Sequence, residues 1–172
     1  LDSHTRDGLT DAEILALAAR CPLLVSLPPL IKTSEEEAHL TARLQVLRDG
    51  GITRFMVTNI GQIKLVDDLG IDFMAGDYQL NLTNDLTAAA LSQIGLSRQT
   101  ISIEMDHARM QELSAIGTIP LELVIYGRLP AMNTRCCPMG NIVGARETDQ
   151  PCTRPCVRRS YALERDGRRY AL

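Results

Sequence analysis

Three cysteines near the end of the chain have the types and spacing that could bind a metal. Cys137, Cys152 and Cys156 follow the pattern C-x14-C-x3-C. The short C-x3-C end brings two sulfurs within reach of one ion or cluster if the intervening turn is tight. The spacing therefore predicts a site for one iron–sulfur cluster or one zinc ion. Reduced thiols without a ligand, or an adventitious disulfide, are the alternatives.

A fourth ligand for this site is either missing or supplied by Cys136. Adjacent side chains in an extended chain point in opposite directions, so Cys136 and Cys137 are not expected to bind one zinc ion together. No histidine flanks the cysteines, and the chain has no HExxH, GxSxG, phosphate-loop or GxGxxG motif, which leaves no recognisable protease or nucleotide-binding machinery. Cys21, which precedes an apolar segment, is expected to be a small core residue.

The segments that must position this chemistry alternate between strand-like and helix-like patterns. Strands are predicted to begin near residues 23, 52, 71, 100 and 121, with a helix between each pair. The second, fourth and fifth of these are predicted at 52–58, 100–105 and 121–126. This alternation is typical of right-handed βαβ units and a parallel sheet. Five units are too few to close an eight-stranded barrel of about 250 residues. We therefore expect an α/β fold with a partial TIM-barrel-like sheet of about five strands, followed by an irregular tail.

The charge distribution also changes where this tail begins. Residues 128–172 contain nine arginines, no lysine and four acidic residues, whereas the rest of the chain carries nine basic and seventeen acidic residues. We expect a partial barrel domain over residues 1–127. Residues 128–172 are expected to form a Cys- and Arg-rich tail with a possible metal or cluster site and a short hairpin. Such a tail favours an anionic partner such as a phosphate, a carboxylate or RNA, unless it is a solvated segment that pairs with the acidic body.

In parallel α/β folds, the functional residues follow the carboxyl ends of the strands. Reading those positions gives a polar set with one firm cation, Arg128. Asn81 and Glu104 also belong to it, although Asn81 could simply shape a turn and Glu104 could simply favour a helix dipole. The full set is Asn59, Gly76, Asp77, Asn81, Glu104, Tyr126, Gly127 and Arg128.

The chain has neither a charged leader followed by an apolar segment nor any run of about eighteen apolar residues. It is therefore expected to be soluble and cytoplasmic, with no membrane partner. An open sheet would expose its edge, so we also expect self-association through that edge.

Residues 122–156 carry a resemblance to a known family. They contain Glu122, the run YGRLPAM at 126–132, Cys137-Pro138 and Cys152-x3-Cys156, and an Arg-Asp-Gly-Arg turn follows at 165–168. This pattern resembles the signature of the U32 peptidase (collagenase-like) family, in the branch that reads YGRxPLM, CP and C-x3-C. Two features differ. Pro130 stands where the wider family has a cysteine, and the branch's fourth cysteine would lie beyond Leu172. We therefore expect the chain to be a fragment of a longer protein.

The resemblance implies a TIM-like barrel in the full family member and an iron–sulfur cluster on Cys137, Cys152 and Cys156, with zinc as the alternative cofactor. It also implies relatives that hydroxylate RNA bases or quinone precursors. We expect such hydroxylation or RNA modification here. A genuine protease and a non-catalytic, zinc-stabilised RNA-binding module are the alternatives. Together with the strand-end positions, the resemblance gives Glu122, Arg128, Glu104 and Asn81 as candidate catalytic residues.

Overall fold

The computed structural model describes residues 9–127, 129–130, 137–143, 156 and 159–171. The chain divides into two compact units, Leu1–Gly127 and Arg128–Leu172, and each is described by itself. In the described part of the chain, no helix has both the length and the apolar character needed to cross a membrane.

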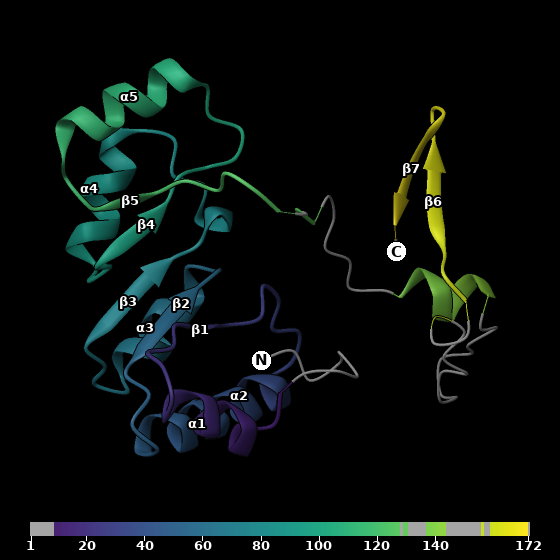
Figure 1. Ribbon diagram of the computed structural model, residues 1–172, viewed down its shortest axis with the longest axis horizontal. Coiled ribbons are helices and arrows are strands. Elements are labelled where there is room, and N and C mark those ends of the chain that lie inside the picture. Colours follow the sequence, from purple (N-terminus) through teal and green to yellow (C-terminus); the bar gives the residue numbers. More distant parts are fainter. Residues whose placement is uncertain (1–8, 128, 131–136, 144–155, 157–158, 172) are drawn as a thin grey trace. The chain divides into compact units, whose positions relative to one another are not determined.

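The first unit contains one parallel sheet whose strands lie side by side in chain order (Figure 1). Parallel neighbours must be joined by crossover connections, and a helix lies between each pair of strands. The α/β fold with five parallel strands is therefore confirmed, and it is consistent with a partial barrel. The strands are β1 (Val25–Ser26), β2 (Arg54–Val57), β3 (Phe73–Gly76), β4 (Arg98–Thr100) and β5 (Leu121–Glu122).

Polar capping residues fix the starts of most of the helices, although the helix at Gly61–Asp67 begins without a side-chain cap. Thr10 and Glu13 form a reciprocal capping box at the first helix, and Asn84 and Asp106 accept backbone N–H groups at two later ones. A short 3-10 helix, η1 (Tyr78–Leu80), follows β3. The α-helices are α1 (Asp11–Ala18), α2 (Ser34–Asp49), α3 (Gly61–Asp67), α4 (Asp85–Gln93) and α5 (His107–Ile116).

The hydrophobic core lies between the helices and one face of the sheet. On that face, Phe55 and Val57 of β2 are fully buried, and they belong to one cluster with Leu44 of α2, Val66 of α3 and Leu91 of α4. Side chains alternate between the two faces of a strand. The opposite face therefore carries the intervening residues, which include Arg54, Phe73, Arg98, Thr100 and Glu122.

The last two strands differ from the sequence prediction in their lengths. The predicted strand at 100–105 is observed at 98–100, because the chain turns beyond it and Met105 N donates to Ser102 O. The predicted strand at 121–126 pairs with β4 only at Leu121 and Glu122. Its remaining residues are exposed, Tyr126 to 97%. A parallel strand can extend only as far as its neighbour does, so the early end of β4 also limits β5.

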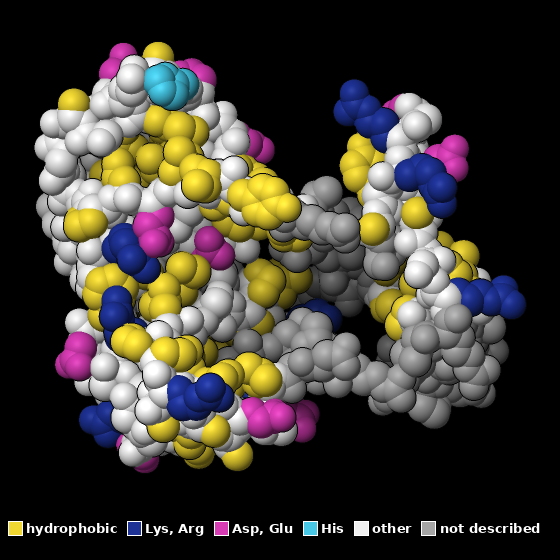
Figure 2. Space-filling view, in the orientation of Figure 1, with side chains coloured by type: hydrophobic (Ala, Val, Ile, Leu, Met, Phe, Trp, Pro, Cys, Tyr) yellow, Lys and Arg dark blue, Asp and Glu magenta, His cyan; other side chains and the backbone are white. Residues whose placement is uncertain are grey.

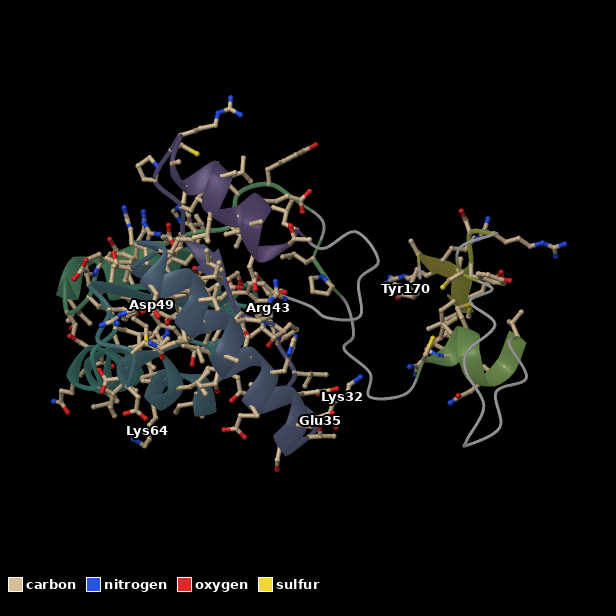
Figure 3. The ribbon with its side chains drawn as sticks, turned by 90° about the horizontal axis from the view of Figure 1, so that it is seen from below. Lys32, Glu35, Arg43, Asp49, Lys64 and Tyr170 are labelled. Atoms are coloured by element: carbon tan, nitrogen blue, oxygen red, sulfur yellow. The ribbon has the colours of Figure 1, made fainter. Side chains whose placement is uncertain are left out.

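An ion pair joins the first two helices. The Arg43 guanidinium on α2 (Figure 3) donates from Nε at 2.9 Å and from a terminal nitrogen at 2.7 Å to Asp11 Oδ1 of α1. Both side chains are mostly buried, so Arg43→Met should cost about 1–2 kcal/mol in the free energy of unfolding, measured in urea. Arg48→Met on the same helix breaks an exposed pair with Asp49 and should cost less than about 0.5 kcal/mol. Equal losses of unfolding free energy in the two variants would contradict the conclusion that the buried Arg43–Asp11 pair stabilises the fold more than the exposed Arg48–Asp49 pair.

The second unit contains an antiparallel hairpin of β6 (Ala162–Arg165) and β7 (Arg168–Ala171). Its turn places Asp166 and Gly167 at positive φ. A single π-helical turn, η2 (Met139–Val143), precedes it in the chain. The small C-terminal hairpin is therefore as predicted.

Candidate functional site

A row of polar side chains crosses the carboxyl edge of the sheet. The register pairs Gly76 with Gln99 and Thr100 with Glu122, so Asp77, one residue beyond Gly76, stands level with Thr100. Asp77, Thr100 and Glu122 therefore lie on three neighbouring strands at the same height and on the face away from the core. This row is the place where parallel α/β folds bind their substrates.

Asp77 is the residue of this row with a perturbed acidity. Partial burial raises the pKa of the Asp77 carboxyl, and the negative charge of Glu122 raises it further, while a hydrogen bond from Tyr78 N opposes both. That bond, 2.8 Å from Tyr78 N to Asp77 Oδ1, also holds the side chain in place. A carboxyl held in this way can take up a proton more readily than an ordinary aspartate.

Glu122 is held by cationic and hydroxyl neighbours. Arg98 Nε lies 3.1 Å from Glu122 Oε2, and Thr100 Oγ1 donates to the same oxygen at 3.5 Å. The Arg98 guanidinium also lies 5.3 Å from the Phe73 ring centroid, and the Arg54 guanidinium lies 4.7 Å from it. Two arginines on one ring, beside a carboxylate, give this face of the sheet mixed charge (Figure 2).

Asn81 ties the loop after β3 to the loop after β4. It has left-handed backbone dihedral angles and accepts a 2.8 Å hydrogen bond from the buried Ser102 hydroxyl. Glu104, by contrast, donates its backbone N–H to Ser102 Oγ at 3.4 Å and has an exposed side chain. The structure therefore brings Glu122 and Asp77 into one row, while Asn81 supports the adjacent loops. The catalytic roles of Asn81 and Glu104 stay predictions, and Arg128 lies outside the described residues.

Beneath the row, Gln99 fills space that Gly76 leaves open. Its side chain is fully buried, and Nε2 donates to Asp77 O at 3.0 Å and to Thr100 O at 2.7 Å. A Cβ on Gly76 would clash with Gln99 Oε1 and lie 2.6 Å from Leu96 Cδ2. The Gln99 amide therefore supports the backbone at Asp77 and at Thr100. It can do so only because residue 76 has no side chain.

A groove of about 630 Å³ opens between the loop after β2 and the segment that runs from η1 into α4, and it is lined by none of the row residues. Ile60, Leu86 and Ile94 give it exposed apolar walls. Gln79 also lines it, and the buried Gln79 Oε1 has no hydrogen-bond partner among the described residues. Apolar walls with a few polar groups are typical of small-molecule sites.

Two of the four candidate metal ligands can be described. Cys137 and Cys156 are both exposed and unbridged, and Cys137 Sγ accepts a hydrogen bond from Gly140 N at 3.3 Å. Cys136 and Cys152 lie outside the described residues, within which no group of three or more potential metal-binding side chains is found. The core position expected for Cys21 is wrong, because Cys21 lies exposed in the turn after α1.

The raised pKa of Asp77 predicts how pH affects stability. Ionising this carboxyl is harder in the folded chain than in the unfolded one, so the free energy of unfolding falls as pH rises from the ordinary value of 3.8 through the raised one. Asp77→Asn should therefore raise the urea midpoint at pH 7, and the gain should shrink as pH falls below 3.8. Asp67→Asn at the exposed end of α3 is the control. A gain from Asp77→Asn that grows toward low pH would contradict this account.

Sequence reasoning reached Asp77 and Glu122 separately and missed their neighbours. Arg98, Thr100 and Phe73 belong to the site because strand register places them beside Glu122 and Arg54. The only feature of the sequence that could have linked Arg98 to Thr100 is the alternation of side chains along a strand, because residues two apart point to the same face.

The model of one protein family, described as Peptidase family U32, matches residues 6–171. No curated protein and no solved structure matches the chain.

Proposed function

Because the chain belongs to peptidase family U32, we propose that it acts in the iron–sulfur-dependent hydroxylation or related modification of a ring-containing substrate. RNA is the first candidate substrate and a quinone precursor is the second. The observation that carries the proposal is the carboxyl of Asp77, with its raised pKa, beside Glu122 at the carboxyl edge of the sheet. Replacing a ring hydrogen by a hydroxyl group releases a proton, and a carboxyl with a raised pKa such as Asp77 suits the task of accepting it.

The cysteines fit the proposed cluster by their chemistry. Cys137 and Cys156 are exposed thiols, and the N–H to sulfur bond on Cys137 is of the kind that tunes cluster ligands. With Cys152, and Cys136 as a candidate fourth ligand, they would hold the cluster. When bound, it would supply electron transfer that no protein side chain offers.

The remaining residues have roles that do not depend on the cluster. The apolar groove with Gln79 would bind the ring and accept a hydrogen bond from it. Asp77 would hold and release the proton, while Arg98 keeps the Glu122 carboxylate in position. Arg128 and its basic neighbours would attract the anionic part of the substrate.

The test is the iron and acid-labile sulfide content, with a visible spectrum, of protein purified without oxygen. The triple variant of Cys137, Cys152 and Cys156 to alanine should lose both iron and sulfide. Cys21→Ala, which removes an exposed thiol elsewhere in the chain, should keep them. Stoichiometric zinc in place of iron would instead favour the zinc-stabilised RNA-binding module. Protein without any metal would overturn both.

The two carboxylates also favour a second candidate, the protease that the family name suggests. Two neighbouring carboxyl groups, one of them with a raised pKa as in Asp77, can act as acid and base in peptide hydrolysis. This candidate requires peptide cleavage by metal-free protein that Asp77→Asn abolishes. Unchanged cleavage in that variant, or no cleavage by the wild type, would dismiss it.

A further inference from the structure

The two faces of the C-terminal hairpin carry different side chains. The register pairs Leu163 with Tyr170 and Arg165 with Arg168 across the strands. Because side chains alternate along each strand, these four residues share one face, here called the arginine face. The other face carries Glu164 directly opposite Arg169. One face therefore has two arginines in direct opposition, and the other has an opposite-charge pair.

The arginine face has charge without an equal counter-charge. Like charges directly opposite each other across a hairpin destabilise it. The contact that offsets this charge among the described residues is the 3.6 Å pair between Arg165 Nε and Asp166 Oδ2, in which both side chains are at least 80% exposed. Such an exposed pair contributes little. An anion placed between the two guanidinium groups would relieve the repulsion.

The rest of this face is apolar and exposed. Leu163 is 43% exposed and Tyr170 is 38% exposed, and Figure 3 labels Tyr170 on β7. An aromatic ring next to two guanidinium groups is the combination that binds single-stranded nucleic acid, because the ring stacks on a base while the cations contact phosphates. An acidic peptide would use the arginines but has no flat ring to stack on Tyr170.

We propose that the arginine face of the β6–β7 hairpin binds single-stranded RNA, with Tyr170 stacked on a base and Arg165 and Arg168 on the backbone phosphates. This inference rests on the proposed function for the choice of RNA, and it names the substrate class and the surface that holds it. The arginine face is made of other residues than the thiols and the strand-end row, so variants can test each of them independently.

The experiment measures the affinity of the whole chain for a fluorescently labelled single-stranded RNA by anisotropy over a range of salt concentrations. Tyr170→Leu should weaken binding about tenfold or more, because stacking is lost, whereas Tyr170→Phe should bind like the wild type. Arg168→Gln should weaken binding and reduce the salt slope by about 0.7, the value for one lost phosphate contact on a single strand. Arg168→Lys should restore most of that slope.

Arg169→Gln is the matched control, since it removes the same charge from the adjacent position on the other face. It should change affinity less than about twofold. Equal losses in Arg168→Gln and Arg169→Gln would overturn the proposal, because they would indicate a general charge effect. Poly-glutamate that competes as well as RNA would also overturn it, because it offers negative charge without bases to stack on Tyr170. RNA binding by a wild-type chain that contains neither iron nor zinc would leave this inference standing while the proposed function fails.

Discussion

Replacing Phe55 with alanine is expected to remove about 3–5 kcal/mol from the free energy of unfolding. Phe55 is fully buried in β2, between Val25 of β1 and Met74 of β3, and it belongs to the cluster that the helices cover. Its loss would leave a cavity that packed neighbours on both strands cannot fill. Urea unfolding followed by circular dichroism measures the change. A loss of this size would be a large part of the stability of a domain this small.

Phe73→Ala is the matched control, because Phe73 is the chain's other phenylalanine and lies in the neighbouring strand on the opposite face. It is only partly buried, and its ring contacts Arg54 and Arg98. The expected cost is about 1–2 kcal/mol, from lost area and two partly exposed cation–π contacts. Equal costs for the two variants would mean that both faces of the sheet are buried alike, contrary to the structure.

Asp77→Asn should slow the proposed modification reaction by about 10²- to 10⁴-fold, which is the usual contribution of a positioned acid–base group. Asparagine keeps an oxygen that can accept the hydrogen bond from Tyr78 N but cannot exchange the proton. RNA affinity should stay within about threefold of the wild type, since Asp77 is proposed to act in the reaction step. Mass spectrometry of the nucleosides gives the rate in cluster-loaded protein.

Glu104→Gln decides between two carboxylates that sequence position alone could not separate. Glu104 is exposed, and among the described residues its carboxylate makes no hydrogen bond or ion pair, whereas Asp77 stands beside Glu122. If Asp77 is the acid–base group, Glu104→Gln should react within about threefold of the wild-type rate. A large loss in Glu104→Gln with a normal rate in Asp77→Asn would reverse the assignment.

The order of strands and helices could be predicted because each element carries its own local signal. Polar caps such as Thr10 and Asn84 precede the helices, and apolar runs such as residues 52–58 indicate the strands. The ends of the strands could not be predicted in the same way. The apolar run at 121–126 looks like one strand, but pairing ends at Glu122 because β4 ends at Thr100. That limit is set by a neighbour in space.

The same distinction applies to the site. Position after a strand was enough to mark Asp77, and the resemblance marked Glu122, but only the register shows that the two share one row. Arg98 was missed because it precedes the predicted strand and reaches Glu122 from the neighbouring one. The thiols are the reverse case. Spacing marks Cys137, Cys152 and Cys156 as ligands, with Cys136 as a candidate fourth, but Cys136 and Cys152 lie outside the described residues.

The contact between Gly76 and Gln99 has a consequence for evolution. Because the Gln99 amide occupies the space where a side chain on residue 76 would stand, the two positions should change together among relatives. A relative with alanine or serine at position 76 should carry a shorter residue than glutamine at position 99. The backbone carbonyls of Asp77 and Thr100 would then need another donor. Joint variation at these two positions would therefore identify lineages in which the edge of the sheet has been rebuilt.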